Sequence, residues 1–120
     1  MEPLRQIKPD EVVYNGWRKV IKKTIALPSG KAEEIEVVGD SSSQAAVIIA
    51  LTKDNKVIIA KQYRAGPDTI MAELPGGQIN NSESPEEAAI RELKEETGYT
   101  TQNITKLGSV FKDGYFNYQH

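Results

Sequence analysis

One stretch of this 120-residue chain, residues 77–99, constrains the fold most because it carries a complete set of helix signals. Ser84 is a favoured N-cap residue, and Pro85 suits the first helical position. Glu87 stands three residues after Ser84, as a capping box requires. The sequence therefore predicts a helix from about Pro85 to Thr97, with Gly98 as its C-terminal stop.

The same stretch concentrates acidic residues. It holds six carboxylates and two cations, a net charge of −4, whereas the whole chain carries −2. Glu92, Glu95 and Glu96 stand at helix positions i, i+3 and i+4, so they share one face of the predicted helix. An apolar stripe is expected beside this face, and Glu87, Arg91 and Lys94 are expected on the far side. The stripe consists of Ala89, Ile90 and Leu93.

Like charges at this spacing oppose helix formation by about 0.2–0.5 kcal/mol per pair, so the acidic face needs a compensating partner. Mg²⁺ is a natural candidate, because it prefers oxygen ligands and binds through one or two carboxylates together with water and phosphate. The alternative is an ordinary acidic helix face that solvent screens.

The spacing of the fixed residues resembles the Nudix box. The matching positions are Gly77, Glu83, Arg91-Glu92-Leu93, Glu95-Glu96 and Gly98-Tyr99. Tyr99 is a mild departure, because the family more often has an aliphatic residue there. The resemblance implies the family's α/β/α sandwich with a mixed β-sheet, in the α+β or α/β class, here preceded by an N-terminal β-hairpin.

The resemblance also implies a metal site. Glu92, Glu95 and Glu96 match the family's ligands for Mg²⁺, with Mn²⁺ as an alternative ion, and the carbonyl group of Gly76 commonly completes the shell. Glu83 lies outside the helix and is expected to orient a ligand or an outer water molecule. Arg91 is expected to pair with a carboxylate such as Glu83.

Two tracts upstream resemble the ADP-ribose pyrophosphatase branch of the family. They are Gln62-Tyr63-Arg64 and Glu73 to Gly77. By this likeness Arg64 would hold a phosphate and Glu73 would help to shape the site, although an arginine at a strand end is also often a solvated charge. Trp17 is expected either to stack on a base or to belong to the core.

Taken in order, residues 1–16 look like an N-terminal arm, and residues 17–120 are expected to form the Nudix domain. Residues 17–38 predict a β-hairpin with a turn at Pro28-Ser29-Gly30-Lys31, and the box spans 77–99. The apolar run 45–52 predicts a strand buried on both faces. Further strands are predicted at 56–64, as its antiparallel partner, and at 69–74 and 104–111.

Composition excludes several classes of protein. With no cysteine, neither a disulfide framework nor a thiolate zinc site is possible. The start of the chain lacks an apolar signal core, and no run approaches the ~18 apolar residues of a membrane span. We therefore expect a soluble cytoplasmic protein without a membrane partner. An isoelectric point near 5.5 and the lack of a clustered basic patch argue against nucleic-acid binding.

The leading functional interpretation is Mg²⁺-dependent hydrolysis of a nucleoside diphosphate linked to another moiety, such as ADP-ribose or a related nucleotide sugar. The alternatives are a nucleoside triphosphate pyrophosphohydrolase and a nucleotide-sensing module or poorly active fragment. The likeness suggests a homodimer. Because the family's domain normally continues past a segment like 110–120, the chain is expected to be a truncated or minimal form, with a catalytic base in some relatives falling after His120.

Overall fold

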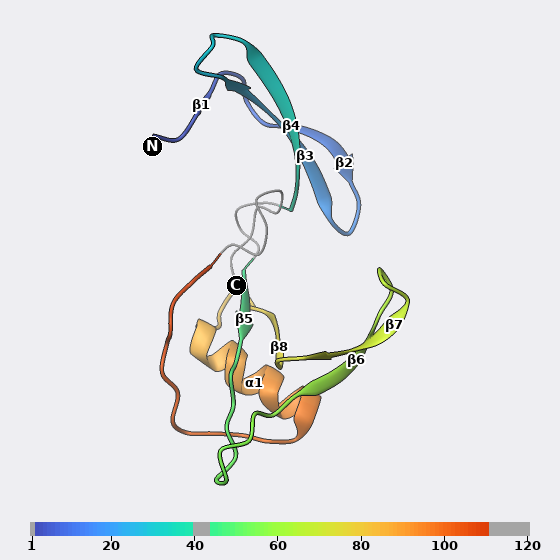
Figure 1. Cartoon of the computed structure of the whole chain (residues 1–120), viewed down its shortest axis with the longest axis vertical. Helices are drawn as coiled ribbons and strands as arrows, with labels where there is room; N and C mark the ends of the chain where they lie inside the picture. The colour runs from blue at the N-terminus through green and yellow to red at the C-terminus, as the bar shows by residue number, and fades with distance from the viewer. Residues whose placement is uncertain (1, 40–43, 111–120) are drawn as a thin grey trace. The chain divides into compact units, whose positions relative to one another are not determined.

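The structure is a computed structural model, and it describes residues 2–39 and 44–110. They fall into two compact units, one that includes residues 2–39 and Val110 and one running from Gln44 to Ser109 (Figure 1). No helix in the described part of the chain is long and apolar enough to cross a membrane.

The first unit is an antiparallel sheet built around one long strand. Strand β3 (Lys19–Ala26) pairs with β4 (Ala32–Val38) along one edge. Along its other edge β3 pairs with β1 (Arg5–Gln6) and β2 (Glu11–Asn15). The predicted hairpin is confirmed, with strand β3 beginning two residues after Trp17. The segment expected to be an arm supplies β1 and β2 to the same sheet.

The hairpin turn has a local cause. The amide of Gly30 donates to the Leu27 carbonyl, and the amide of Leu27 donates to the Lys31 carbonyl, each at 2.9 Å. Gly30 adopts φ 81°, a left-handed conformation that glycine takes without steric cost. Ile21, Thr24 and Val37 are the buried side chains of this sheet. Only a small core results.

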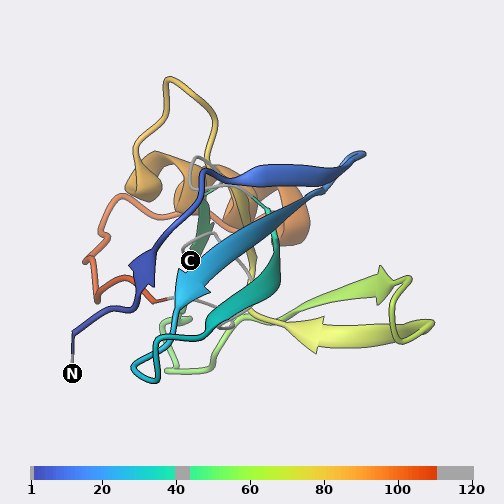
Figure 2. The same cartoon turned by 90° about the horizontal axis from the view of Figure 1, so that it is seen from above.

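The second unit contains four strands and a helix. Strand β5 (Ala45–Val47) pairs with β8 (Gly76–Gln78), and β6 (Ala60–Arg64) pairs with β7 (Thr69–Glu73). All strand pairs in the described residues are antiparallel. Helix α1 (Pro85–Thr97) packs against β5 and β8, while the β6–β7 hairpin extends away from the helix (Figures 1 and 2).

Helix α1 begins and ends as the sequence predicts. The Ser84 hydroxyl accepts from the Glu87 amide at 3.1 Å, and the Glu87 carboxylate accepts from the Ser84 amide at 2.8 Å. Gly98 ends the helix at φ 77°, and its amide donates to the Lys94 carbonyl. The buried core under the helix consists of Ala46, Ile48, Ala88, Ala89 and Leu93. Ala88 was not part of the predicted apolar stripe, although it is fully buried.

The prediction of a strand from 45 to 52 buried on both faces is wrong. Strand β5 ends at Val47, and burial alternates along the rest of the run. Ala46 and Ile48 face the helix core, whereas Val47 and Ile49 are about half exposed. This alternation is the period of an extended chain covered on one side. An unbroken apolar run therefore does not by itself show that both faces are buried.

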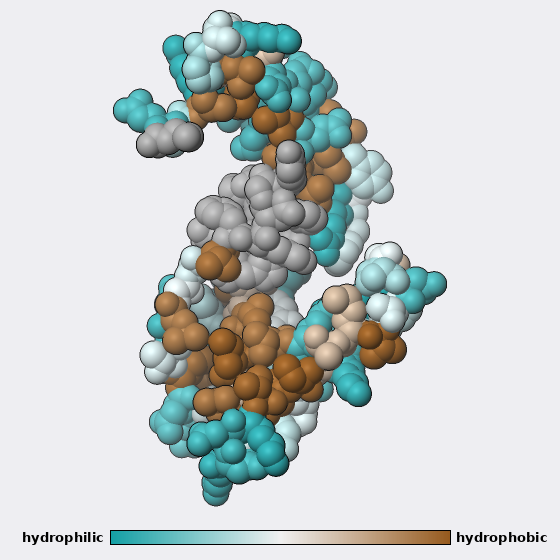
Figure 3. Space-filling model, in the orientation of Figure 1, coloured by the Kyte–Doolittle hydropathy of each residue, from teal (hydrophilic) through white to brown (hydrophobic). Residues whose placement is uncertain are grey.

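The partner segment 56–64 also divides in two. Its first part joins the preceding run through the Leu51–Val57 bridge and the bond from the Ile58 amide to the Ala50 carbonyl. Its second part is β6, which pairs with β7 instead. Apolar side chains are exposed over this unit (Figure 3), among them Val47, Ile49, Leu51, Val57 and Ile59.

The predicted strand at 104–111 is also wrong as far as it is described. Residues 104–110 form no strand or helix, and residue 111 lies outside the described residues. Ile104 nevertheless packs against the core, so its apolar character reflects packing and not a sheet ladder. Leu107 is 81% exposed.

Candidate active site

Two carboxylates of helix α1 lie against the two glycines that open strand β8. A Cβ atom added to Gly77 would fall 2.2 Å from Glu92 Oε1, so the glycine is required for this close approach. The amide of Gly76 donates to Glu96 Oε2 at 3.1 Å. The backbone of the glycine pair therefore lies directly against Glu92 and Glu96. Glycine allows this close approach because it has no Cβ atom.

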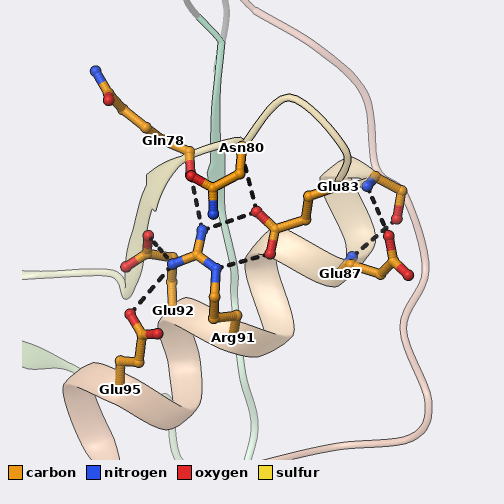
Figure 4. Close-up of polar contacts among 8 residues, drawn as sticks. Gln78, Asn80, Glu83, Glu87, Arg91, Glu92 and Glu95 are labelled. Carbon is orange, nitrogen blue, oxygen red and sulfur yellow. Dashed lines mark hydrogen bonds and ion pairs between the residues drawn. The ribbon is translucent and has the colours of Figure 1, made fainter.

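Arg91 is the centre of the acidic cluster on the helix (Figure 4). Its Nε and Nη2 donate to the two carboxylate oxygens of Glu83, at 2.8 and 3.0 Å. Its Nη1 donates to Glu92 at 2.7 Å and to Glu95 at 3.2 Å. Nη2 also donates to the Gln78 carbonyl at 2.9 Å, which ties the helix to β8. One guanidinium thus joins three carboxylates and a strand.

The predicted pair between Arg91 and Glu83 is confirmed, but the expected position of Arg91 on the far side of the helix is wrong. Its long side chain reaches its neighbour Glu92 and, one turn further on, Glu95. The Arg91 guanidinium lowers the pKa of the Glu83 carboxyl, and the Asn80 amide adds to this effect. Hydrogen bonds to Glu83 and Glu92 raise the pKa of Arg91 in turn.

Glu96 is held differently. Besides the Gly76 amide, its Oε1 accepts from the side-chain amide of Gln62 on β6. The sequence interpretation took Arg64 from the Gln62-Tyr63-Arg64 tract and missed Gln62. The strand period was the available signal, because Gln62 and Arg64 stand two residues apart and so share a face of β6.

Arg64 and Glu73 lie together on the β6–β7 hairpin. Arg64 Nε donates to both carboxylate oxygens of Glu73 at 3.0 Å, and Nη2 donates to Oε2 at 2.5 Å. The pKa of Arg64 is raised, chiefly by this hydrogen bonding to Glu73, with a smaller contribution from the charge of Glu96. A single ion pair thus links the two residues predicted to bind substrate, near the acidic helix face.

Trp17, the third predicted substrate residue, belongs to the first unit. The residue is 87% exposed, so the alternative interpretation as a core residue is wrong. The Arg18 guanidinium lies 5.0 Å from the centroid of the Trp17 ring, within the usual range of a cation–π contact. Stacking of Trp17 on a base stays a prediction.

The donor set fits a hard divalent cation. Glu92, Glu95 and Glu96 offer only carboxylate oxygens, the donors that Mg²⁺ prefers. As they stand, no three acidic or histidine side chains in residues 2–39 and 44–110 converge on one point that could hold a metal ion. Arg91, Gln62 and the Gly76 amide occupy oxygens of these carboxylates, so binding of a cation would exchange some of these contacts. The role of the Gly76 carbonyl stays a prediction.

The comparisons agree with this geometry. The model of the NUDIX domain matches residues 42–120. An ADP-ribose pyrophosphatase of Bacillus subtilis is 36% identical over 104 residues, which cover 84% of this chain and 54% of that protein. An ADP-sugar pyrophosphatase of Mus musculus is 38% identical over 103 residues, covering 78% of this chain and 47% of that protein. The chain belongs to the Nudix family.

A solved structure supports the fold. The crystal structure of an ADP compounds hydrolase superposes with a TM-score of 0.83 at 25% identity, covering 99% of this chain and 66% of that one. The predicted fold class, an α+β Nudix fold, is therefore confirmed, as is the likeness to the ADP-ribose pyrophosphatase branch. The chain spans about half the length of the curated relatives that it matches.

Proposed function

We propose that this chain hydrolyses the diphosphate bond of a nucleoside diphosphate linked to another moiety, using Mg²⁺, and that ADP-ribose is its substrate. The observation that carries the proposal is the placement of Glu92 and Glu96, one helical turn apart, against the backbone of Gly76 and Gly77. Carboxylates of this kind hold the cation on which the family's chemistry depends.

Each residue near the site has a role in this proposal. Glu92, Glu95 and Glu96 would hold Mg²⁺, which when bound neutralises the diphosphate charge and makes a phosphorus easier to attack. Arg91 orients Glu92 while Glu83 fixes its guanidinium. Arg64 would contact a phosphate, and Glu73 would hold its guanidinium in place. Water would add to one phosphorus of ADP-ribose, releasing AMP and ribose 5-phosphate.

The choice of substrate rests on the relatives and on the hairpin. Two relatives are named for ADP-ribose or ADP-sugar pyrophosphatase activity. The Arg64–Glu73 pair places a guanidinium, a good partner for phosphate oxygens, on the strand that also contacts Glu96 through Gln62. A diphosphate bound by a cation at Glu96 would therefore lie close to the Arg64 guanidinium.

A substrate panel tests the proposal. The chain is incubated with Mg²⁺ and ADP-ribose, an ADP-sugar, or a nucleoside triphosphate, and products are separated by chromatography. We expect AMP and ribose 5-phosphate from ADP-ribose, and no product when a chelator removes the cation. Faster release of pyrophosphate from the triphosphate would favour the triphosphate pyrophosphohydrolase. Tight binding of ADP-ribose without any product would favour a nucleotide-sensing module.

We further propose that the chain forms a homodimer through the first unit. Its sheet buries few side chains, while the apolar residues of β2 and the tryptophan beyond it lie on the surface. These exposed residues are Val12, Val13, Tyr14 and Trp17. A monomer at micromolar concentration in analytical ultracentrifugation would contradict this proposal, because such a surface gains stability only when something covers it.

A further inference from the structure

The three carboxylates of the acidic stripe are held by two kinds of donor. Arg91, a cation, contacts Glu92 and Glu95. Glu96 instead accepts from two neutral groups, the Gly76 amide on Oε2 and the Gln62 side-chain amide on Oε1. The two donors therefore fix the direction of both carboxylate oxygens of Glu96. Because both donors are neutral, they do not cancel its negative charge.

Strand β6 presents Gln62 to the helix. Side chains alternate along a strand, so Ala60, Gln62 and Arg64 share one face and Lys61 and Tyr63 the other. Ala60 is buried and Gln62 is partly buried, whereas Lys61 is exposed. Five paired positions with β7 hold the strand in place. The regular β6–β7 hairpin thus holds the side-chain amide of Gln62 next to Glu96, which is 34 residues away in the sequence.

The chemistry of an amide suits this position. A carboxylate only accepts hydrogen bonds, so the NH₂ group of Gln62 must face Glu96. A neutral donor orients a carboxylate but keeps its full charge and its remaining lone pairs for a cation. A lysine or arginine at the same place would bring a second positive charge next to that cation.

We propose that Gln62 is a positioning residue, which orients Glu96 for cation binding and thereby ties the β6–β7 hairpin to the metal site. The proposal rests on the proposed function, because it takes Glu96 as a ligand. It adds a role for a residue that neither the box nor the phosphate-binding arginine accounts for. Gln62 acts through Glu96 and need not touch the substrate.

The first test uses Gln62→Met, which keeps the length of the side chain and removes the donor. Binding of Mn²⁺ alone is followed by the loss of its free-ion EPR signal. We expect the Mn²⁺ dissociation constant to rise about 10- to 100-fold, the range found when partners of metal ligands are removed. Gln102→Met, at an exposed position of the same unit, is the matched control and should bind as wild type does. Thermal melts establish that each variant is folded.

A double-mutant cycle separates positioning from a general structural effect. If Gln62 acts through Glu96, Gln62→Met should change Mn²⁺ affinity in the wild-type background and leave it unchanged in the Glu96→Gln background. Equal losses in both backgrounds would overturn the proposal, as would wild-type affinity in Gln62→Met. If Gln62→Met does not fold, Gln62→Asn, which keeps the amide but is one methylene shorter, takes its place in the same cycle.

The outcomes also separate this proposal from the proposed function. The positioning role alone would be contradicted if the wild-type chain binds Mn²⁺ and hydrolyses ADP-ribose and the Gln62→Met variant behaves in the same way. Wild-type chain that binds no Mn²⁺ would overturn both. Weakened binding in Gln62→Met with coupling to Glu96 supports the positioning role even if the preferred substrate is a different nucleotide.

Discussion

The two ends of helix α1 hold their carboxylates in different ways. In the first turn, Glu87 bonds to the backbone of Ser84, three residues away, and closes the capping box. In the later turns, Glu96 bonds to Gln62 and Gly76, which are 34 and 20 residues away. The same side chain type completes a local motif at one end and joins separate strands at the other.

This difference separates the acidic residue that stabilises the start of the helix from those that we propose to bind a metal ion. A capping carboxylate satisfies an amide that the helix itself leaves unpaired, so its contribution is to folding. A carboxylate held by distant groups adds little to the helix and needs the tertiary fold for its direction. We therefore expect changes in the first turn to alter stability, and changes in the later turns to alter metal binding and turnover.

The largest expected effect is that of Glu96→Gln on turnover. If Glu96 is a metal ligand as proposed, its loss should lower the proposed hydrolysis of ADP-ribose about 10²-fold or more, because metal stabilisation of the transition state amounts to several kcal/mol. The thermal midpoint should hold or rise, since one member of a like-charged stripe is removed. Glu86→Gln, in the first turn of the same helix, is the matched control and should keep wild-type turnover. Comparable rates in the two variants would contradict the assignment.

Gly77→Ala should weaken metal binding with little effect on folding. The added Cβ would meet the carboxylate of Glu92, the mobile end of a side chain, which can turn aside. We expect a loss of about 10-fold in Mn²⁺ affinity, as for a displaced ligand partner. Isothermal titration calorimetry and thermal melts measure the two properties.

Gly76→Ala makes a contrasting control. Its Cβ would fall 2.4 Å from the Ala46 carbonyl oxygen, which belongs to the backbone of β5. The β5–β8 ladder would have to shift, so unfolding should become easier by about 1–3 kcal/mol. If Gly76→Ala and Gly77→Ala lost stability equally, the distinction between a backbone clash and a side-chain clash would be wrong.

Ser84→Ala should affect stability and leave turnover alone. Removing the N-cap hydroxyl costs about 1 kcal/mol, which lowers the melting temperature of a domain of this size by about 4 °C. The variant should keep the wild-type kcat below that temperature, because the capping bonds of Ser84 lie within the first turn of the helix. Reduced kcat at unchanged KM would show that the two ends of α1 are coupled.

The smallest expected effect is that of Glu87→Gln on the melting temperature at acidic pH. The amide of Ser84 lowers the pKa of Glu87 from its ordinary value of 4.5 in the folded chain. A lowered folded pKa stabilises the fold above the unfolded pKa, and this contribution is lost as pH falls below about 4.5 and through the folded pKa. Glu87→Gln keeps a capping side chain that does not titrate, so its melting temperature should fall less steeply with acid. Parallel profiles would rule out this source of pH dependence.

The sequence by itself determined the bounds and the caps of helix α1. Ser84, Pro85, Glu87 and Gly98 act within one or two turns of where they stand, so their contacts follow from spacing alone. The hairpin of the first unit was predictable for the same reason, because the Gly30 turn is local. The spacing of the box residues likewise indicates the family from the sequence alone.

Only the tertiary structure decided the remaining features. Sequence predicted the pair of Arg91 with Glu83 but not the contacts of Arg91 with Glu92 and Glu95, because the direction of a long side chain depends on what surrounds it. It could not show that the run after Val47 is covered on one side, since a continuous apolar sequence is compatible with burial of one face or of both. Nor could it bring Gln62 to Glu96, because a contact across 34 residues exists only once the strands and the helix have packed.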